Sequence, residues 1–256
     1  MPNWKRNAAR ATERALLVLL LAGPPAAADA LDDLRSTLKR LQGAEPVKAA
    51  VEFQFARTTS EDGGPVTLQG TVTARVEDGP QGLRVGWDRT TLQQAESEQR
   101  LYALDPLIPA PTAQIMRSLT ALDLAEHLHQ GETLERLLLQ ASLLETRPDP
   151  WQGRPATLLV VQFRPVLNPP SLRRAVNEAK GQARIWLGPD GVPLAWRGDV
   201  TYKGSRFMIH FHGTQTAEVR LLRTGTRLVG AWAQYEEHQD GLGQSLVTRR
   251  GYRFTF

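Results

Sequence analysis

The hydrophobic positions of residues 31–57 recur with two different periods. From Leu31 to Leu41 the leucines stand three or four positions apart, which predicts a short amphipathic helix that ends before Pro46. From Val47 the period changes to two, so that apolar and polar side chains alternate along the chain. This change predicts a half-buried strand directly after the helix.

The same alternation predicts two more strands before residue 90. Apolar residues alternate with threonines and other polar residues over 66–76, where Gly70 marks a bend or a bulge. After a turn at 78–80, residues 83–87 form the third segment of this kind. Three consecutive strands joined by short turns rich in glycine and proline are typical of an antiparallel meander.

Prolines and leucine-rich helical periods interrupt the meander in the middle of the chain. Residues 101–104 are expected to form one more short strand before the prolines at 106, 109 and 111. Apolar positions then recur with helical spacing, which predicts helices over 112–129 and 132–144. We expect these helices to act as a lid on the sheet.

The strand period returns after residue 157 and continues to the last residue. A continuous apolar run predicts a strand at 158–163, and residues 172–180 are expected to form a short helix or a lid loop ended by Gly181. Further alternating segments lie at 183–187, 192–202, 207–211, 217–222, 226–236 and 246–256.

The order of these elements predicts a mainly β protein of the α+β type. We expect a curved antiparallel sheet or incomplete β-barrel of about nine to eleven strands, with helices covering or plugging its concave face. No internal repeat or low-complexity linker divides the chain, so residues 31–256 are expected to form a single domain. The chain has no cysteine, and its stability must therefore come from the burial of a core.

The first thirty residues have the pattern of a secretory signal peptide. Four basic residues precede an unbroken apolar run at 15–22, and residues 28–30 form a small-x-small cleavage site. The run has eight residues, whereas a membrane-spanning helix needs about twenty. Pro24 stands where a bacterial lipoprotein would carry its acylated cysteine. We therefore expect cleavage near Ala30 and release of a soluble protein into the periplasm of a Gram-negative envelope.

The charge of the chain does not favour nucleic acid as a partner. The formal net charge is +4, and removal of residues 1–30 takes away four basic and two acidic side chains, which leaves +2. Both signs are interspersed, and no run of five or more like charges occurs. A nucleic-acid footprint needs clustered lysines and arginines, so no nucleic-acid partner is expected.

Sequence motifs for catalysis are absent, but one group of histidines could hold a metal. There is no Gly-x-Ser-x-Gly elbow and no phosphate-binding glycine loop. His210 and His212 stand two apart on a predicted strand, and His238 with Glu236 or Glu237 could complete a zinc site. The alternative is that these histidines form the solvent side of an amphipathic strand. We expect no enzyme activity, no metal and no cofactor, and keep a histidine-based metalloenzyme as an alternative.

Aromatic residues on the predicted strands form the candidate ligand-binding site. They are either ordinary sheet core or the lining of a cavity for an apolar ligand, because a strongly curved sheet cannot fill its own concave side. The predicted cavity-lining residues are Phe53, Phe55, Val72, Val85, Trp87, Trp196, Phe207, Ile209 and Phe211.

The order of elements resembles the periplasmic lipoprotein carriers of the LolA/LolB superfamily. The likeness lies in the signal peptide, the leucine helix, the strand at 47–55, the hairpin through 70–87, and the helices followed by further antiparallel strands. It covers most of residues 31–256 and implies an incomplete barrel whose concave face, lidded by helices, holds acyl chains. The chain departs from the family in its greater length and in segment 166–181. The family's lid-contacting arginine cannot be matched to any one of the many arginines here.

These observations predict a soluble exported protein that binds or carries a lipid, a lipoprotein acyl chain or another apolar ligand without catalysis. Its other partners are expected among envelope proteins. Residues 249–256 leave a second function open, because a glycine, alternating apolar positions and the terminal Phe256 resemble the assembly signal of outer-membrane barrels. An outer-membrane β-barrel protein is therefore an alternative, although the leucine-rich middle of the chain does not fit it.

Overall fold

The computed structural model of the chain describes residues 27–61, 64–167, 170–206, 209–241 and 243–256. Most of the predicted signal peptide lies outside these residues, and so does Phe207.

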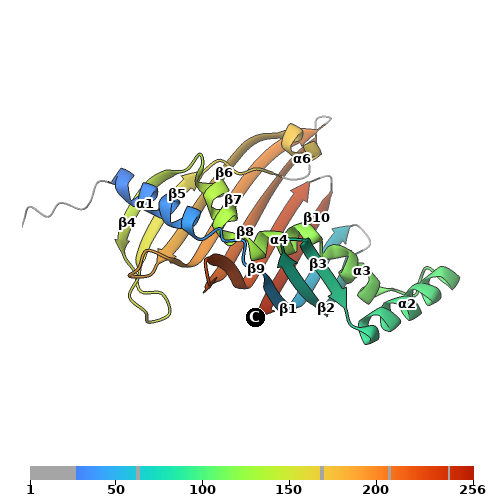
Figure 1. The fold of residues 1–256 in the computed structure, drawn as a ribbon. Helices are drawn as coiled ribbons and strands as arrows, with labels where there is room; N and C mark the ends of the chain where they lie inside the picture. The colour runs from blue at the N-terminus through green and yellow to red at the C-terminus, as the bar shows by residue number, and fades with distance from the viewer. Residues whose placement is uncertain (1–26, 62–63, 168–169, 207–208, 242) are drawn as a thin grey trace, which may run out of the picture.

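Ten antiparallel strands form one open sheet, in the order β3-β2-β1-β10-β9-β8-β7-β6-β5-β4 (Figure 1). Strand β1 pairs with β10, which joins the first part of the chain to the last. Strands β3 and β4 lie at the two edges, as in the incomplete barrel that the sequence predicts. The strand bounds are β1 (Val47–Glu61), β2 (Gly64–Gly79), β3 (Gly82–Trp87), β4 (Ser142–Pro148), β5 (Thr157–Phe163), β6 (Val176–Leu187), β7 (Pro193–Arg206), β8 (Ile209–Thr224), β9 (Arg227–Gly241) and β10 (Gln244–Thr255).

Helices cover one face of the sheet, which we call the inner face (Figure 1). Helix α1 contacts β4, α3 contacts β2, and α4 and α5 both contact β9. Helix α2 projects beyond the sheet edge and packs on α3. The helix bounds are α1 (Ala27–Arg40), α2 (Arg89–Leu104), α3 (Pro111–Ser118), α4 (Ala121–Leu128), α5 (Gln130–Leu138) and α6 (Pro170–Ala175).

The main core fills the space between the inner face and the helices. Leu34 and Leu38 of α1 and Leu128 of α4 are fully buried in it, together with Phe53 of β1 and Val219 of β8. The leucines of the helices thus pack against the inward-facing apolar residues of the strands in one apolar layer. This packing confirms the predicted α+β architecture.

The strand predicted at 101–104 is wrong, because these residues end helix α2. The Asp88 side chain caps this helix by accepting a hydrogen bond from the Thr91 amide at 2.8 Å. A side-chain acceptor at this position stabilises the first helical turn. The helix then continues for 16 residues to Leu104, and its backbone hydrogen bonds are made within the helix.

The two helices predicted over 112–144 are shorter than expected. Thr120 and Asp123 form a capping box that starts α4, so the segment 112–129 is divided into α3 and α4. The helix predicted over 132–144 ends early, because residues 142–148 pair with β5 and form the edge strand β4.

Strands in the second half of the chain are longer than predicted. The segments 207–211 and 217–222 belong to one strand, β8, as far as the described residues extend. Residues 176–180, expected in a helix or lid loop, belong to β6, where Lys180 pairs with Thr201 of β7.

Candidate ligand-binding site

A pocket of about 480 Å³ lies between the inner face of the sheet and helices α4 and α5, and we call it the inner pocket. Its lining divides into an apolar and a polar section. The apolar section comes mainly from α5, β5, β7 and β8 and consists of Leu137, Phe163, Val166, Trp196, Val200 and Ala217. The polar section comes from α4, β8, β9 and β10 and consists of Asp123, Glu126, His127, Gln215, Thr216, Tyr235, Glu236, Glu237, Thr248, Arg250 and Tyr252.

Glycines on two neighbouring strands make room for the aromatic rings of the apolar section. Gly181 of β6 pairs with Phe163, and a Cβ atom there would lie 2.7 Å from the Phe163 ring. On β7, a Cβ atom at Gly198 would lie 3.0 Å from the Trp196 ring. Without these side chains the rings can lie along the sheet instead of standing away from it.

Trp196 also links the pocket floor to the helices. Its indole Nε1 donates a hydrogen bond to Oε1 of Gln130 at 3.0 Å, and Nε2 of Gln130 donates to the Glu126 carbonyl at 2.8 Å. Trp196 and Gln130 are both buried. These two consecutive hydrogen bonds fix the position of the indole relative to the α4–α5 junction.

Arg250 lies between two carboxylates in the polar section. Its guanidinium is 3.8 Å from the Asp123 carboxylate and 3.9 Å from the Glu237 carboxylate. Glu237 also accepts hydrogen bonds from Gln215 at 3.1 Å and from the Tyr202 hydroxyl at 3.4 Å. Burial raises the pKa of Tyr202 to about 12, so this phenol stays protonated and remains a donor.

Glu126 stands at the mouth of the pocket and remains exposed. Among the described residues, no cationic group lies within 4.0 Å of its carboxylate. Desolvation raises the pKa of the Glu126 carboxyl above its usual value, because the charged form is less well hydrated there.

His127 separates the pocket from the core and is only 2 % exposed. Its ring contacts three aromatic rings, at centroid distances of 4.4 Å to Tyr252, 5.4 Å to Phe254 and 5.7 Å to Tyr235. Within the described part of the chain, Nδ1 has no hydrogen-bond partner. Burial lowers the pKa of His127 to about 3, so the imidazole is neutral at physiological pH.

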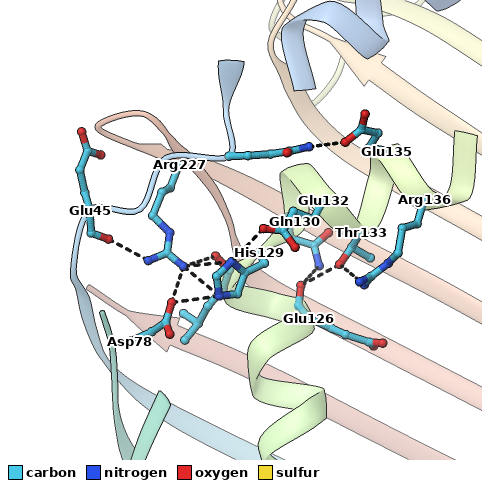
Figure 2. A network of polar contacts seen from close by, with 12 residues as sticks. Glu45, Asp78, Glu126, His129, Gln130, Glu132, Thr133, Glu135, Arg136 and Arg227 are labelled. Atoms are coloured by element: carbon cyan, nitrogen blue, oxygen red, sulfur yellow. Dashed lines mark hydrogen bonds and ion pairs between the residues drawn. The ribbon is translucent and has the colours of Figure 1, made fainter. Parts of the chain in front are cut away.

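A buried polar cluster fixes the α4–α5 junction to the sheet, and we call it the anchor cluster (Figure 2). Arg227, at the start of β9, donates to the Asp78 carboxylate at 2.5 Å, to the Leu128 carbonyl at 3.2 Å and to the Glu45 carbonyl at 2.7 Å. His129 Nε2 lies 3.0 Å from the same Asp78 carboxylate. One guanidinium thus joins β2, β9, the segment after α1 and the helices that wall the inner pocket.

The nine predicted cavity residues divide between the core and other places in the fold. Phe53, Phe55 and Val72 are buried in the main core, and Trp87 is half-buried against it. The reason is that α3 packs on β2 and fills the inner face there. Of the nine, within the described residues, Trp196 alone lines the inner pocket.

Two of the remaining predicted cavity residues, Val85 and Phe211, lie on edge strand β3 and near the start of β8. Val85 is 36 % exposed on edge strand β3, and Phe211 is half-buried beside Tyr202. Phe207 and the side chain of Ile209 lie outside the described part of the structure. Ligand binding by these residues stays a prediction.

The histidines of the alternative zinc site each lie beside a carboxylate. His212 Nε2 is 3.4 Å from Asp240, and His238 Nε2 is 2.5 Å from Glu236. In the described residues, no three histidine, aspartate or glutamate side chains form a group that could hold a metal ion.

The hairpin of α2 and α3 carries an exposed apolar tip. Leu104 is 84 % exposed and Leu107 is 90 % exposed, and Leu101, Tyr102 and Ile108 are exposed nearby. None of the described helices is both long enough and apolar enough to cross a membrane.

Comparison with known proteins gives weak structural likenesses. No family model matches the chain, and no curated protein matches it by sequence. An outer membrane lipoprotein-sorting protein domain from Vibrio parahaemolyticus is 10 % identical at a TM-score of 0.28, and 90 % of this chain and 93 % of that chain are covered. This is a protein of the kind that the sequence resembles. MucB in complex with MucA(peri) is 11 % identical at a TM-score of 0.18, with 90 % and 94 % covered. TM-scores this low support no argument about function.

Proposed function

We propose that the protein is an exported, non-catalytic carrier that holds a lipid, a lipoprotein acyl chain or another apolar ligand in the inner pocket. The observation that supports this proposal is the apolar section of the pocket, where Phe163, Trp196 and Val200 face open space on an otherwise packed inner face. A volume of about 480 Å³ lies within the range of small-molecule sites. Exposed apolar walls of this kind gain free energy when an apolar chain replaces water.

Filling the pocket is expected to weaken ligand binding without unfolding the protein. Val200 lies half-buried on the pocket wall, so the indole of Val200→Trp would occupy the space for the ligand. We expect the affinity for dodecanol, measured by isothermal titration calorimetry, to weaken at least about tenfold. The reason is that the indole would cover apolar pocket surface that the alkyl chain of dodecanol would otherwise bury. The matched control is Val66→Trp on β2, at a valine that is 73 % exposed and outside the pocket.

Two outcomes would count against this site. Equal affinity of Val200→Trp and the unchanged protein would place the ligand elsewhere. Equal loss in Val66→Trp would mean that a bulky residue anywhere disturbs binding.

Export is expected to follow from residues 1–30. A tagged full-length chain expressed in a Gram-negative host should be recovered from the osmotic-shock fluid with a new N-terminus near Leu31. N-terminal sequencing of the shock-fluid protein checks the cleavage site. An unprocessed chain that stays in the cytoplasm would contradict the export proposal.

A further inference from the structure

The polar section of the inner pocket carries more negative than positive charge. Asp123, Glu126, Glu236 and Glu237 contribute four carboxylates, of which Glu236 is paired with Arg249 and His238, whereas Arg250 contributes one guanidinium. We propose that the ligand is a single-chain amphiphile with a positively charged amine at one end, and that Glu126 is the main partner of this amine. The inference rests on the proposed function, because it specifies the ligand of the same pocket.

The contacts of Arg250 leave Glu126 as the carboxylate available to a ligand. Arg250 is shared between Asp123 and Glu237 at 3.8 and 3.9 Å. Glu237 has two further donors in Gln215 and Tyr202. No ion pair of Glu126 occurs among the described residues, although it faces the same space. Arg136 and Arg250 act on Glu126 only through longer-range attraction, so a cation that enters the pocket finds a carboxylate without an ion-pair partner among the described residues.

The other polar groups of this section do not offset the negative charge. Tyr252 is buried and Tyr235 is half-buried, and desolvation raises the pKa of both phenols, so they stay neutral. His127 is buried beside them and is also neutral. Among the described residues that line the pocket, Arg250 is the one cationic partner for a carboxylate headgroup, and its guanidinium already lies between two carboxylates. The pocket thus disfavours a free fatty acid.

The arrangement of the apolar and polar sections determines how the ligand is oriented in the inner pocket. The apolar wall includes Trp196 and Val200 on β7, whereas Arg250 lies on β10, three strands further along the sheet. Neighbouring strands are about 4.8 Å apart, so the strands of Trp196 and Arg250 are roughly 14 Å apart. Glu126 faces the pocket from α4, so an elongated molecule can lie with its chain over Val200 and Trp196 and its amine on the α4 side, near Glu126.

Three ligands with the same twelve-carbon chain test the inference. Dodecylamine, dodecanol and dodecanoate share the alkyl chain and carry a positive, a neutral and a negative headgroup at pH 7.5, and their affinities for the full mature chain can be measured by calorimetry below the concentrations at which each aggregates. We expect dodecylamine to bind about tenfold or more tightly than dodecanoate. Near a protein surface, the attraction of one carboxylate for the ammonium and its repulsion of the carboxylate headgroup are sufficient for this ratio. The preference should fall in 1 M NaCl, where charges at the pocket mouth are screened.

Isosteric variants assign the preference to a residue. Glu126→Gln should reduce the ratio of amine to carboxylate affinity to about threefold or less, because it removes charge and not volume. The matched control is Glu96→Gln on α2, which removes an exposed carboxylate far from the pocket and should leave the ratio unchanged. Val200→Trp should weaken binding of all three ligands, which separates pocket binding from adsorption of amine elsewhere.

The outcomes distinguish this inference from the proposed function. If dodecanoate binds as tightly as dodecylamine while dodecanol also binds, the amine inference is wrong and the carrier function stands. A preference that survives in Glu126→Gln would overturn the role of Glu126. If none of the three ligands binds, the proposed function fails and the inference fails with it.

Discussion

Replacing Arg227 with methionine is expected to lower the free energy of unfolding by about 3–5 kcal/mol. The guanidinium is fully enclosed and pairs with the buried Asp78 carboxylate. Methionine would leave that carboxylate without its strongest partner, and the Leu128 and Glu45 carbonyls would each lose a donor. A buried charge left without its partner is among the most destabilising changes in a protein core.

Urea denaturation of matched arginine variants measures this effect. Arg100→Met removes an exposed pair with Glu96 and should change stability by less than about 1 kcal/mol. Combining Arg227→Met with Asp78→Asn should lower stability by less than the two single changes added together. The reason is that Asp78→Asn removes the carboxylate charge that Arg227→Met leaves without a partner. If Arg227→Met were no more destabilising than Arg100→Met, the anchor cluster would not hold the helices on the sheet.

Acid is expected to destabilise the protein through His127. The folded state lowers the pKa of this imidazole to about 3, whereas the unfolded chain titrates near 6.5. As pH falls below 6.5, protons bind the unfolded chain and not the folded one, so stability decreases until the folded pKa is reached. Between pH 7 and pH 4.5 this one group accounts for a loss of about 2–3 kcal/mol.

The variant His127→Phe isolates this contribution from that of the carboxylates. Phenylalanine keeps the contacts with Tyr235, Tyr252 and Phe254 and removes the unpartnered Nδ1. At pH 7 the variant should be about as stable as the unchanged protein, and at pH 4.5 it should be about 2–3 kcal/mol more stable. Urea midpoints at both pH values give the comparison. Parallel loss of stability in the two proteins on acidification would show that His127 is not the group that titrates.

The sheet could be predicted from the sequence because its signals are local. Alternation from Val47 onward and the turns rich in glycine and proline indicate strands without knowledge of their neighbours. The leucine spacing likewise indicates α1. The errors arose where short-range capping competes with periodicity, as at Asp88 and Thr120, which start helices that the apolar pattern alone does not delimit.

The candidate site could be predicted only in part, because it depends on which helix covers which strands. The inner apolar rows of β1 and β7 both alternate with polar residues, but Phe53 of β1 is buried in the main core, next to β2 on which α3 packs, whereas Trp196 of β7 lines the pocket. No sequence signal distinguishes these two rows. Arg227 is likewise one arginine among many until its contacts with Asp78 and Leu128 are seen.

Photo-crosslinking tests the central claim, that an apolar ligand binds in the inner pocket, most directly. A twelve-carbon alcohol carrying a diazirine in its chain is irradiated with the mature protein, and the adducts are mapped by peptide mass spectrometry. We predict adducts on Phe163, Trp196 and Val200, and their loss when excess dodecanol competes. Adducts confined to the exposed tip around Leu104 and Leu107, or none that dodecanol displaces, would contradict the proposed carrier function.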